Sequence, residues 1–287
     1  MTATRSDVGK KLGAAPQVDV TRLSFNQITS ERASLADVVE ACARHGVSHI
    51  SVWRHRIADV GLERAVRLVR DAGLQLSSVC RGGMFPAATR EERERRIEDN
   101  RRAVDEAAAL GAPVLVLVCG PAPDRDIAAA RDMVEEGIAR LAPYAAERGV
   151  KLGIEPLHPA FAAERSCITT LGEARRLAER FDAATVGIIA DVYHIWWDPE
   201  LYEEIARSAG GRILGFHVSD WLVPATNVLM NRGVMGDGVI ELRRIREAVE
   251  RAGYAGPIEV EIFNESVWGM PIDELLPLLK ARFVEHV

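Results

Sequence analysis

Four short apolar segments of this chain each end in a residue that can bind a metal ion. The four are Glu155 in KLGIE, Asp191 in VGIIAD, His217 in ILGFH and Glu261 in IEVE. Short runs of mostly aliphatic residues between turns or helices predict buried strands. A charged side chain at the end of a buried strand is costly to desolvate unless it is paired or binds a metal. Three carboxylates and one imidazole therefore predict one cation site, of the oxygen-rich kind that suits Mn²⁺, Mg²⁺ or Co²⁺.

Such a site supports proton transfer beside a carbonyl group. A carbonyl and a neighbouring hydroxyl can chelate the ion, which polarises the carbonyl and stabilises the enediolate that forms when the α-proton leaves. Glu155 and Glu261 end the fifth and eighth predicted strands, so they can flank a substrate. One carboxylate can remove the proton and the other can return it, to the same carbon in an epimerase or to the adjacent carbon in an isomerase. Expulsion of a leaving group instead would make the protein a lyase.

The segments that must position these residues alternate regularly between strand-like and helix-like patterns. Helix starts are marked by capping residues at Ser34, Thr89 and Thr170, and Pro143 is expected to break or kink the helix before the fifth strand. The predicted strands cover residues 21–27, 47–53, 74–80, 113–119, 150–155, 186–191, 213–219 and 257–263.

Eight such units without a Pro-, Gly- or Ser-rich linker predict an α/β fold, a single (β/α)8 TIM barrel over residues 19–287. Residues 1–18 are predicted to form a flexible N-terminal tail. A doubly wound open sheet is the structural alternative, but no GxGxxG or Walker motif follows any strand. In a barrel, the C-terminal ends of the strands form the active site. The four ligand-type residues are therefore expected on one face.

The composition excludes several other classes of protein. The chain has 48% hydrophobic and 27% charged residues, as in ordinary soluble proteins. A net charge of -6 argues against nucleic acid as a partner. No apolar run reaches the roughly 18 residues of a membrane span, and the N-terminus lacks the pattern of a signal peptide. The four cysteines are widely spaced, which predicts reduced thiols and a cytoplasmic protein.

Five motifs resemble the xylose-isomerase-like TIM-barrel superfamily, the sugar phosphate isomerase/epimerase family. They are GIEPLHP, ADVYH, GFHVSD, MGDG and EVEIF, and the resemblance covers nearly the whole chain. It implies one divalent metal ion, Mn²⁺ in the first place with Mg²⁺ or Co²⁺ as alternatives, held by Glu155, Asp191, His217 and Glu261. It also implies that the two glutamates are catalytic proton-transfer groups. His194, in ADVYH, is implied to bind substrate or stabilise charge, as a third catalytic residue.

Further residues are predicted to contact the substrate. Trp53, His55 and Arg81 follow the second and third strands and are expected to face the barrel mouth. His158 stands where many ketose epimerases of the family carry an acidic or amide residue. It could bind substrate, act as an acid or simply end its loop.

The long loop after the seventh strand, residues 220–238, is predicted to be a lid, because loops of this length in compact domains are usually functional or disordered. We expect it to carry Arg232 toward the substrate. Glu259, in contrast, is expected to point to the other face of its strand from Glu261 and to pair with a helix residue.

The sequence thus predicts a metal-dependent isomerase or epimerase for a small, carbohydrate-like substrate, and a homodimer or homotetramer would be ordinary for the family. The lack of a phosphate-binding loop favours an uncharged substrate. The alternative is a lyase, either an inosose- or dehydroshikimate-type dehydratase or a β-eliminating deglycosylase, with His158 or His194 as the acid. An apurinic endonuclease would need further histidine ligands, and the fourth strand ends in Cys119 instead. A non-enzymatic barrel would not need all four ligand types.

Overall fold

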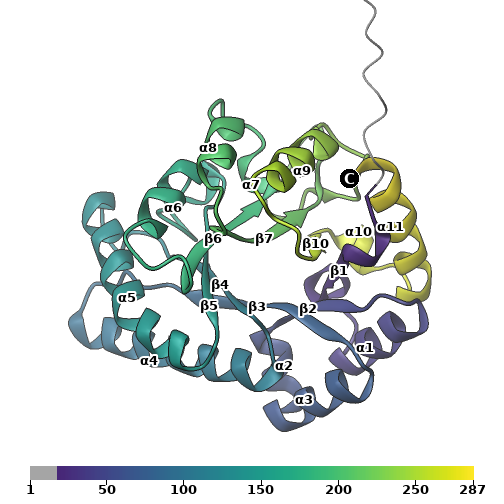
Figure 1. The fold of residues 1–287 in the computed structure, drawn as a ribbon, viewed down its shortest axis with the longest axis horizontal. Coiled ribbons are helices and arrows are strands. Elements are labelled where there is room, and N and C mark those ends of the chain that lie inside the picture. The colour runs from purple at the N-terminus through teal and green to yellow at the C-terminus, as the bar shows by residue number, and fades with distance from the viewer. Residues whose placement is uncertain (1–17) are drawn as a thin grey trace, which may run out of the picture.

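The computed structural model describes residues 18–287, whose strands close into a barrel of eight parallel strands in the order β1-β10-β7-β6-β5-β4-β3-β2 (Figure 1). This confirms the predicted (β/α)8 barrel, and each predicted strand overlaps an observed one. The barrel strands are β1 (Leu23–Asn26), β2 (His49–Trp53), β3 (Gln75–Gly83), β4 (Val114–Val118), β5 (Lys151–Glu155), β6 (Val186–Asp191), β7 (Ile213–Val218) and β10 (Ile258–Val260). A small antiparallel pair, β8 (Asp220–Trp221) with β9 (Arg232–Gly233), lies in the long loop after β7.

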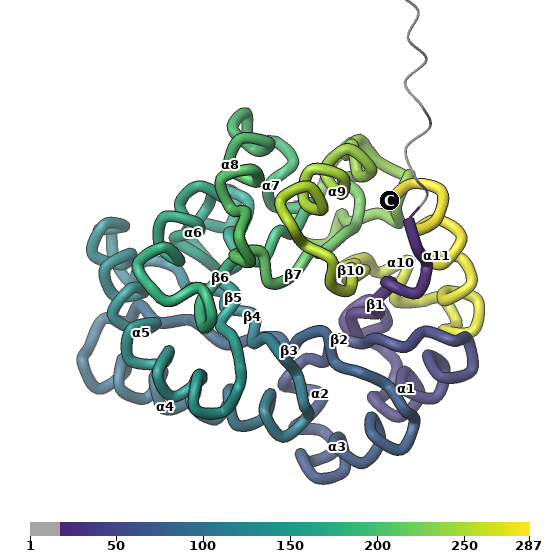
Figure 2. Tube along the Cα trace, viewed as in Figure 1, coloured from purple at the N-terminus to yellow at the C-terminus, as the bar shows by residue number. Residues whose placement is uncertain are grey.

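The helices form a ring outside the strands, as the tube in Figure 2 shows. The C-terminal helix packs against the first helix and so closes this ring beside β1 (Figure 1). The helices are α1 (Leu35–Arg44), α2 (Arg54–Val60), α3 (Leu62–Asp71), α4 (Arg90–Leu110), α5 (Ile127–Glu147), α6 (Leu171–Ala178), α7 (Val192–Ile195), α8 (Leu201–Arg207), α9 (Leu242–Arg251), α10 (Glu265–Trp268) and α11 (Ile272–His286). Short 3₁₀ helices cover Val20–Arg22, Gln27–Ser30 and Pro159–Phe161.

Local sequence signals explain most helix boundaries. The side chains of Ser34, Thr89 and Thr170 each accept a hydrogen bond from the backbone N–H three residues later, as predicted. The break expected at Pro143 is absent, because α5 continues through it. Pro143 is exposed, and the carbonyl of Ala139 that loses its helical donor lies on the same exposed side, where water can satisfy it.

Three further sequence predictions concern the N-terminal tail, membrane-spanning segments and the cysteines. The predicted tail, residues 1–18, lies outside the described residues except for Val18, which is buried. Within residues 18–287, no helix is both long and apolar enough to cross a membrane. All four cysteines are free and buried.

Side-chain alternation along the strands determines what faces the barrel interior. On β5, Leu152 and Ile154 join the main core between strands and helices, whereas a Cβ on Gly153 would meet Ile189 and Val114 inside the barrel. Because alternate residues share a face, Glu155 points inward with Gly153. The same alternation operates on β6, β7 and β10. The inward residues at the C-terminal ends are Glu155, Asp191, His217 and Glu261.

A buried ion pair ties together α6 and α8, the helices before and after β6. Glu204 is 1% exposed and accepts from Arg175 Nε at 2.6 Å and from an Arg207 guanidinium N–H at 2.8 Å. Burial opposes the charged form of Glu204, but the two arginines outweigh it and hold its pKa below the ordinary value of 4.5. The carboxylate therefore stabilises the fold in its ionised form.

Glu204→Gln is expected to lower the free energy of unfolding by about 1–2 kcal/mol near neutral pH, because two charge-assisted hydrogen bonds are weakened. A folded-state pKa below the unfolded one gives stability that is present above the unfolded pKa and lost as the pH falls through the folded one. The difference between wild type and variant in urea unfolding should therefore shrink below about pH 4. Glu203→Gln, an exposed change on the same helix, is the control. An equal loss in both variants, or a difference that persists in acid, would contradict this account.

Candidate metal centre

The four predicted ligand residues converge at the C-terminal end of the barrel. Glu155, Asp191, His217 and Glu261 are all buried, and each offers one ligand atom that lies within 4.8 Å of the other three. A single ion with bonds of roughly 2.1 Å would hold opposite ligand atoms roughly 4.2 Å apart. The spacing therefore fits one cation shared by all four side chains.

Unsatisfied atoms in the cluster point to the same conclusion. Within the described chain, Oε1 of Glu155 and Nδ1 of His217 are buried and have no hydrogen-bond partner, although they lie 3.4 Å from each other. Buried polar atoms are rarely left unpaired unless a water or an ion completes them. A carboxylate oxygen and an imidazole nitrogen facing one point are donors suited to a divalent cation. The residues present thus fit a metal ion.

The prediction for Glu259 was wrong. Residues two apart on a strand share a face, so Glu259 points into the barrel together with Glu261 instead of toward a helix. Its Oε2 lies 3.4 Å from Nε2 of His217, on the opposite side of the ring from Glu155. Burial opposes a charged ring, but Glu259 and Glu155 raise the pKa of His217 well above its ordinary value. Glu259 is therefore placed to orient the ring so that Nδ1 faces the cluster, as carboxylates behind metal-binding histidines do, although Nε2 forms no hydrogen bond within residues 18–287.

Asn26, at the end of β1, was missed by the sequence reasoning. Its Nδ2 donates to Oε2 of Glu259 at 3.2 Å and to Oε1 of Glu261 at 3.1 Å. Its Oδ1 accepts from Nε1 of Trp53 at 2.9 Å. One amide thus fixes both glutamates and links them to the predicted substrate-contact tryptophan. A polar residue at the end of a buried strand was the signal that could have found it.

Arg232 reaches the acid cluster from the loop after β7. One guanidinium nitrogen donates to Oδ2 of Asp191 and to Oε2 of Glu261, both at 2.9 Å, and the side chain is 3% exposed. The guanidinium also lies over the rings of Tyr193 and Phe263, at 4.6 and 5.1 Å from their centroids. The loop after β7 was expected to carry Arg232 to the site, and the structure places Arg232 there. Its role toward a substrate stays a prediction.

The positive charges divide the carboxylates into two kinds. Burial opposes ionisation of Asp191, but the charge of Arg232 outweighs it and lowers the pKa of Asp191. For Glu261, burial prevails, and with the nearby charge of Glu155 it raises the pKa to about 8 despite Arg232. A bound divalent cation would favour the ionised form of both.

His194 is held as a neutral imidazole. Burial lowers its pKa to about 3, although Asp191 opposes the shift. The backbone N–H of His158 lies 3.2 Å from Nδ1, and the tautomer in which Nδ1 accepts this hydrogen bond carries the ring proton on Nε2. Nε2 faces Arg232 at 3.0 Å and Asp191 at 3.6 Å. Because Arg232 is also a donor, it and the ring N–H compete for the same space, and a substrate oxygen between them could accept from both.

Beside the cluster is a cavity of only about 20 Å³, room for about one water molecule. Leu229, from the loop after β7, lines it and packs with Val118, Leu157 and Phe161. The Tyr193 hydroxyl donates to the backbone carbonyl of Val228 at 2.6 Å, which holds the loop down. The loop after β7 therefore covers the site, as expected of the predicted lid.

The other predicted substrate contacts fall into two groups. Trp53 and Arg81 line the small inner cavity and also a larger outer pocket of about 550 Å³. His55 lies only in the outer pocket, where it pairs with Glu31 at 3.2 Å. His158 is half-buried, and its Nδ1 accepts from the backbone N–H of Ala160 at 3.1 Å. The structure does not bring the His55 and His158 side chains to the acid cluster.

Glu259→Gln tests the assignment of Glu259 as the residue behind His217. The amide keeps the shape but removes the charge that orients and polarises the imidazole, so Mn²⁺ should bind about 10- to 100-fold more weakly. Isothermal titration with Mn²⁺ measures the change. Glu265→Gln, an exposed substitution four residues beyond Glu261, is the matched control and should leave the affinity unaltered. Equal Mn²⁺ affinity of Glu259→Gln and wild type would exclude the assignment.

Comparison with known proteins places this architecture among enzymes. The chain is 29% identical over 270 residues to the 3-dehydroshikimate dehydratase of Pseudomonas aeruginosa, and this match covers 88% of the chain and 41% of that protein. The chain thus spans about two fifths of that relative's length. It is 21% identical to the inosose isomerase of Bacillus licheniformis, over 93% of the chain and 98% of the isomerase. A solved structure from Sinorhizobium meliloti 1021 shares 48% identity and a TM-score of 0.91, covering 93% of this chain and 99% of that one.

A match to a family profile agrees with the barrel, the strand-end residues and the motifs that carried the resemblance. The profile is described as xylose isomerase-like TIM barrel, and it matches residues 39–282, which is most of the chain. The chain therefore belongs to the xylose isomerase-like TIM barrel family.

Proposed function

We propose that the protein is a divalent-metal-dependent isomerase or epimerase of a small polyhydroxylated ketone. The observation that carries the proposal is the buried cluster of Glu155, Asp191, His217 and Glu261, in which a carboxylate oxygen and an imidazole nitrogen have no partner in the described chain. A shared cation would compensate the cost of burying three carboxylates at one point. The relationship to an inosose isomerase supports the substrate class.

These four residues would hold the ion, and three carboxylates with one imidazole favour Mn²⁺, with Mg²⁺ or Co²⁺ as alternatives. A bound divalent cation supplies polarisation of the substrate carbonyl and stabilises negative charge on its oxygen. The Nε2–H of His194 and the guanidinium of Arg232 face the same space and would donate to that oxygen as charge develops. A neutral imidazole suits this task because it carries an N–H without adding a charge that competes with the cation.

Proton transfer falls to the two glutamates. In the barrel, β5 is separated from β10 by β6 and β7, so Glu155 and Glu261 approach a bound molecule from different sides. The carboxylate of Glu155 accepts no hydrogen bond within residues 18–287, so the oxygen that does not face the ion can accept the α-proton. Glu261, held by Asn26 and Arg232, would return it from the other side. An epimerase or isomerase needs one group that removes the α-proton and another that returns a proton.

Elimination of water is the second candidate, and one observation favours it. The relative with 29% identity is a dehydratase, whereas the isomerase relative has 21% identity. A lyase of the dehydroshikimate or inosose type, or a β-eliminating deglycosylase, begins with the same proton removal. The Nε2–H of His194 would then hydrogen-bond to the leaving oxygen, and a glutamate would deliver the proton that it took to this oxygen instead of returning it to carbon.

Proton exchange with solvent tests the shared step. In D₂O with saturating Mn²⁺, NMR should show deuterium entering the α-carbon of at least one compound in a panel of ketoses, inososes and hydroxy-keto acids. Glu155→Gln and Glu261→Gln should each slow this exchange by about 10²- to 10⁴-fold at saturating metal, because a general base or acid is lost. Glu265→Gln is the control. If no compound exchanges in a metal-dependent way, the proposal fails.

Product analysis then separates the two candidates. An isomerase or epimerase returns a product of unchanged mass, whereas a dehydratase returns one that has lost water. His194→Gln removes the ring N–H from the leaving oxygen. For a dehydratase it should slow loss of water more than it slows α-proton exchange, and for an epimerase it should leave the mass of the product unchanged.

A further inference from the structure

Two arginines at the inner cavity lack acidic partners. Arg81, on β3, and Arg165, in the segment after β5, both line the cavity beside Glu155 and His194. Among residues 18–287, no carboxylate lies within ion-pair distance of either guanidinium. The guanidinium of Arg165 lies 5.9 Å from the centroid of the Phe161 ring. Both side chains are partly buried.

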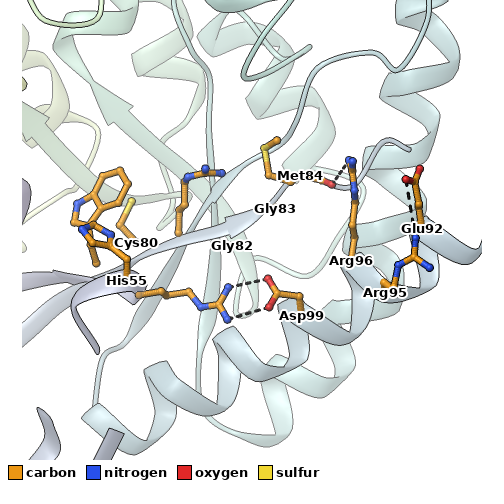
Figure 3. A pocket seen from close by; sticks show the side chains of 12 residues that line it. His55, Cys80, Gly82, Gly83, Met84, Glu92, Arg95, Arg96 and Asp99 are labelled. Atoms are coloured by element: carbon orange, nitrogen blue, oxygen red, sulfur yellow. Dashed lines mark hydrogen bonds and ion pairs between the residues drawn. The ribbon is translucent and has the colours of Figure 1, made fainter. Parts of the chain in front are cut away.

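The other arginines that line the inner cavity and the outer pocket each have a hydrogen-bond or ion-pair partner. Arg54 forms ion pairs with Asp99 at 2.9 Å and with Glu106 at 2.6 Å. In the outer pocket, Arg96 donates to the backbone carbonyl of Met84 at 2.7 Å and Arg95 lies 4.0 Å from Glu92, as Figure 3 shows. Arg232 is held by the acid cluster. Among the arginines that line these two pockets, the lack of a partner is therefore particular to Arg81 and Arg165.

Three cations approach one another around the cavity. Burial lowers the pKa of Arg165, and the charges of Arg81 and Arg232 lower it further. Arg232 is compensated by Asp191 and Glu261, whereas Arg81 and Arg165 have no ion-pair partner among residues 18–287, and Glu164 and Glu261 offset only part of the effect on Arg165. Partly buried like charges are unfavourable unless a counter-charge is supplied. Glu155 and Glu261 line the same cavity, but neither lies within ion-pair distance of Arg81 or Arg165, so an anionic group of the substrate would be the direct partner of both guanidinium groups.

We propose that Arg81 and Arg165 form an anion subsite that binds a carboxylate of the substrate, so that the substrate is a polyhydroxylated keto acid and not a neutral ketone. The inference rests on the proposed function and specifies its substrate class. The planar guanidinium fork matches a carboxylate with two parallel hydrogen bonds. A phosphate ester fits less well, because phosphate sites usually add a cradle of backbone N–H groups and the sequence has no such loop. The uncharged substrate expected from the sequence is thereby revised.

A matched pair of ligands isolates the charge. A polyhydroxylated cyclohexane carboxylic acid and its primary amide are titrated calorimetrically into the Mn²⁺-loaded protein. Wild type should bind the acid at least about tenfold more tightly than the amide, because hydrogen bonds to a charged group are lost in the amide. Arg81→Met and Arg165→Met should each bring this ratio toward unity while leaving amide affinity almost unchanged. Arg95→Met, which removes the same charge from the outer pocket, should keep the wild-type ratio.

Two further measurements keep the test decisive. Raising the salt concentration should reduce the acid-to-amide ratio of wild type, because the subsite is only partly buried. This readout stands even if a methionine variant fails to fold, which loss of amide binding and of a cooperative thermal transition would reveal. A ratio near unity in wild type, or a wild-type ratio in both methionine variants, overturns the inference. Tighter binding of a phosphorylated ketose than of the acid overturns the choice of carboxylate.

Failure of the subsite and failure of the proposed function give different results. If neutral ketones undergo metal-dependent proton exchange and the acid has no advantage, the function stands and the anion subsite is wrong. If the acid binds in a manner that depends on Arg81 and Arg165 but no compound exchanges protons, the subsite stands and the function is wrong.

Discussion

Burial of negative charge at one end of the barrel is the constraint that organises this protein. Glu155, Asp191, Glu259 and Glu261 are each at most 4% exposed, and their charges are tolerable only with compensation. Arg232 and His217 supply positive charge, and Asn26 supplies hydrogen bonds to two of the glutamates. These groups do not satisfy the whole cluster, because a carboxylate oxygen of Glu155 and a ring nitrogen of His217 have no hydrogen-bond partner within the described residues. A cation at that point would complete it, and the proposed chemistry depends on this single balance.

Much of this arrangement was predictable from sequence. The eight strands were found because short aliphatic runs alternate with capped helices, and a closed parallel barrel brings all strand ends to one face. That rule alone brought Glu155, Asp191, His217 and Glu261 together. Loop length also indicated that residues 220–238 cover the site, and Arg232 was expected to come with them. These successes depend on backbone periodicity and topology, which one sequence records well.

The misses concern side-chain direction and long-range pairing. Glu259 was misassigned because the period of a strand was applied incorrectly, since residues two apart share a face. Arg165 was overlooked because it lies in an irregular segment with no periodic signal. His158 lies three residues after Glu155 in the sequence, but its ring packs 5.1 Å from the ring of Trp221. Its backbone N–H, and not its side chain, donates to His194. Such placements depend on contacts between distant segments, which no local pattern encodes.

The loop after β7 joins two properties that are usually separate. Leu229 shields the inner cavity, and Arg232, three residues later, neutralises the acids beneath it. Shielding and neutralisation are therefore thermodynamically linked, and the linkage is reciprocal. A second positive charge arriving among the carboxylates weakens the attraction that draws the loop down, and a lifted loop leaves the carboxylates freer to receive that charge. The ion pairs of Arg232 with the acids thus hold the loop closed, and the strength of these pairs governs how readily cations and ligands enter through the barrel mouth.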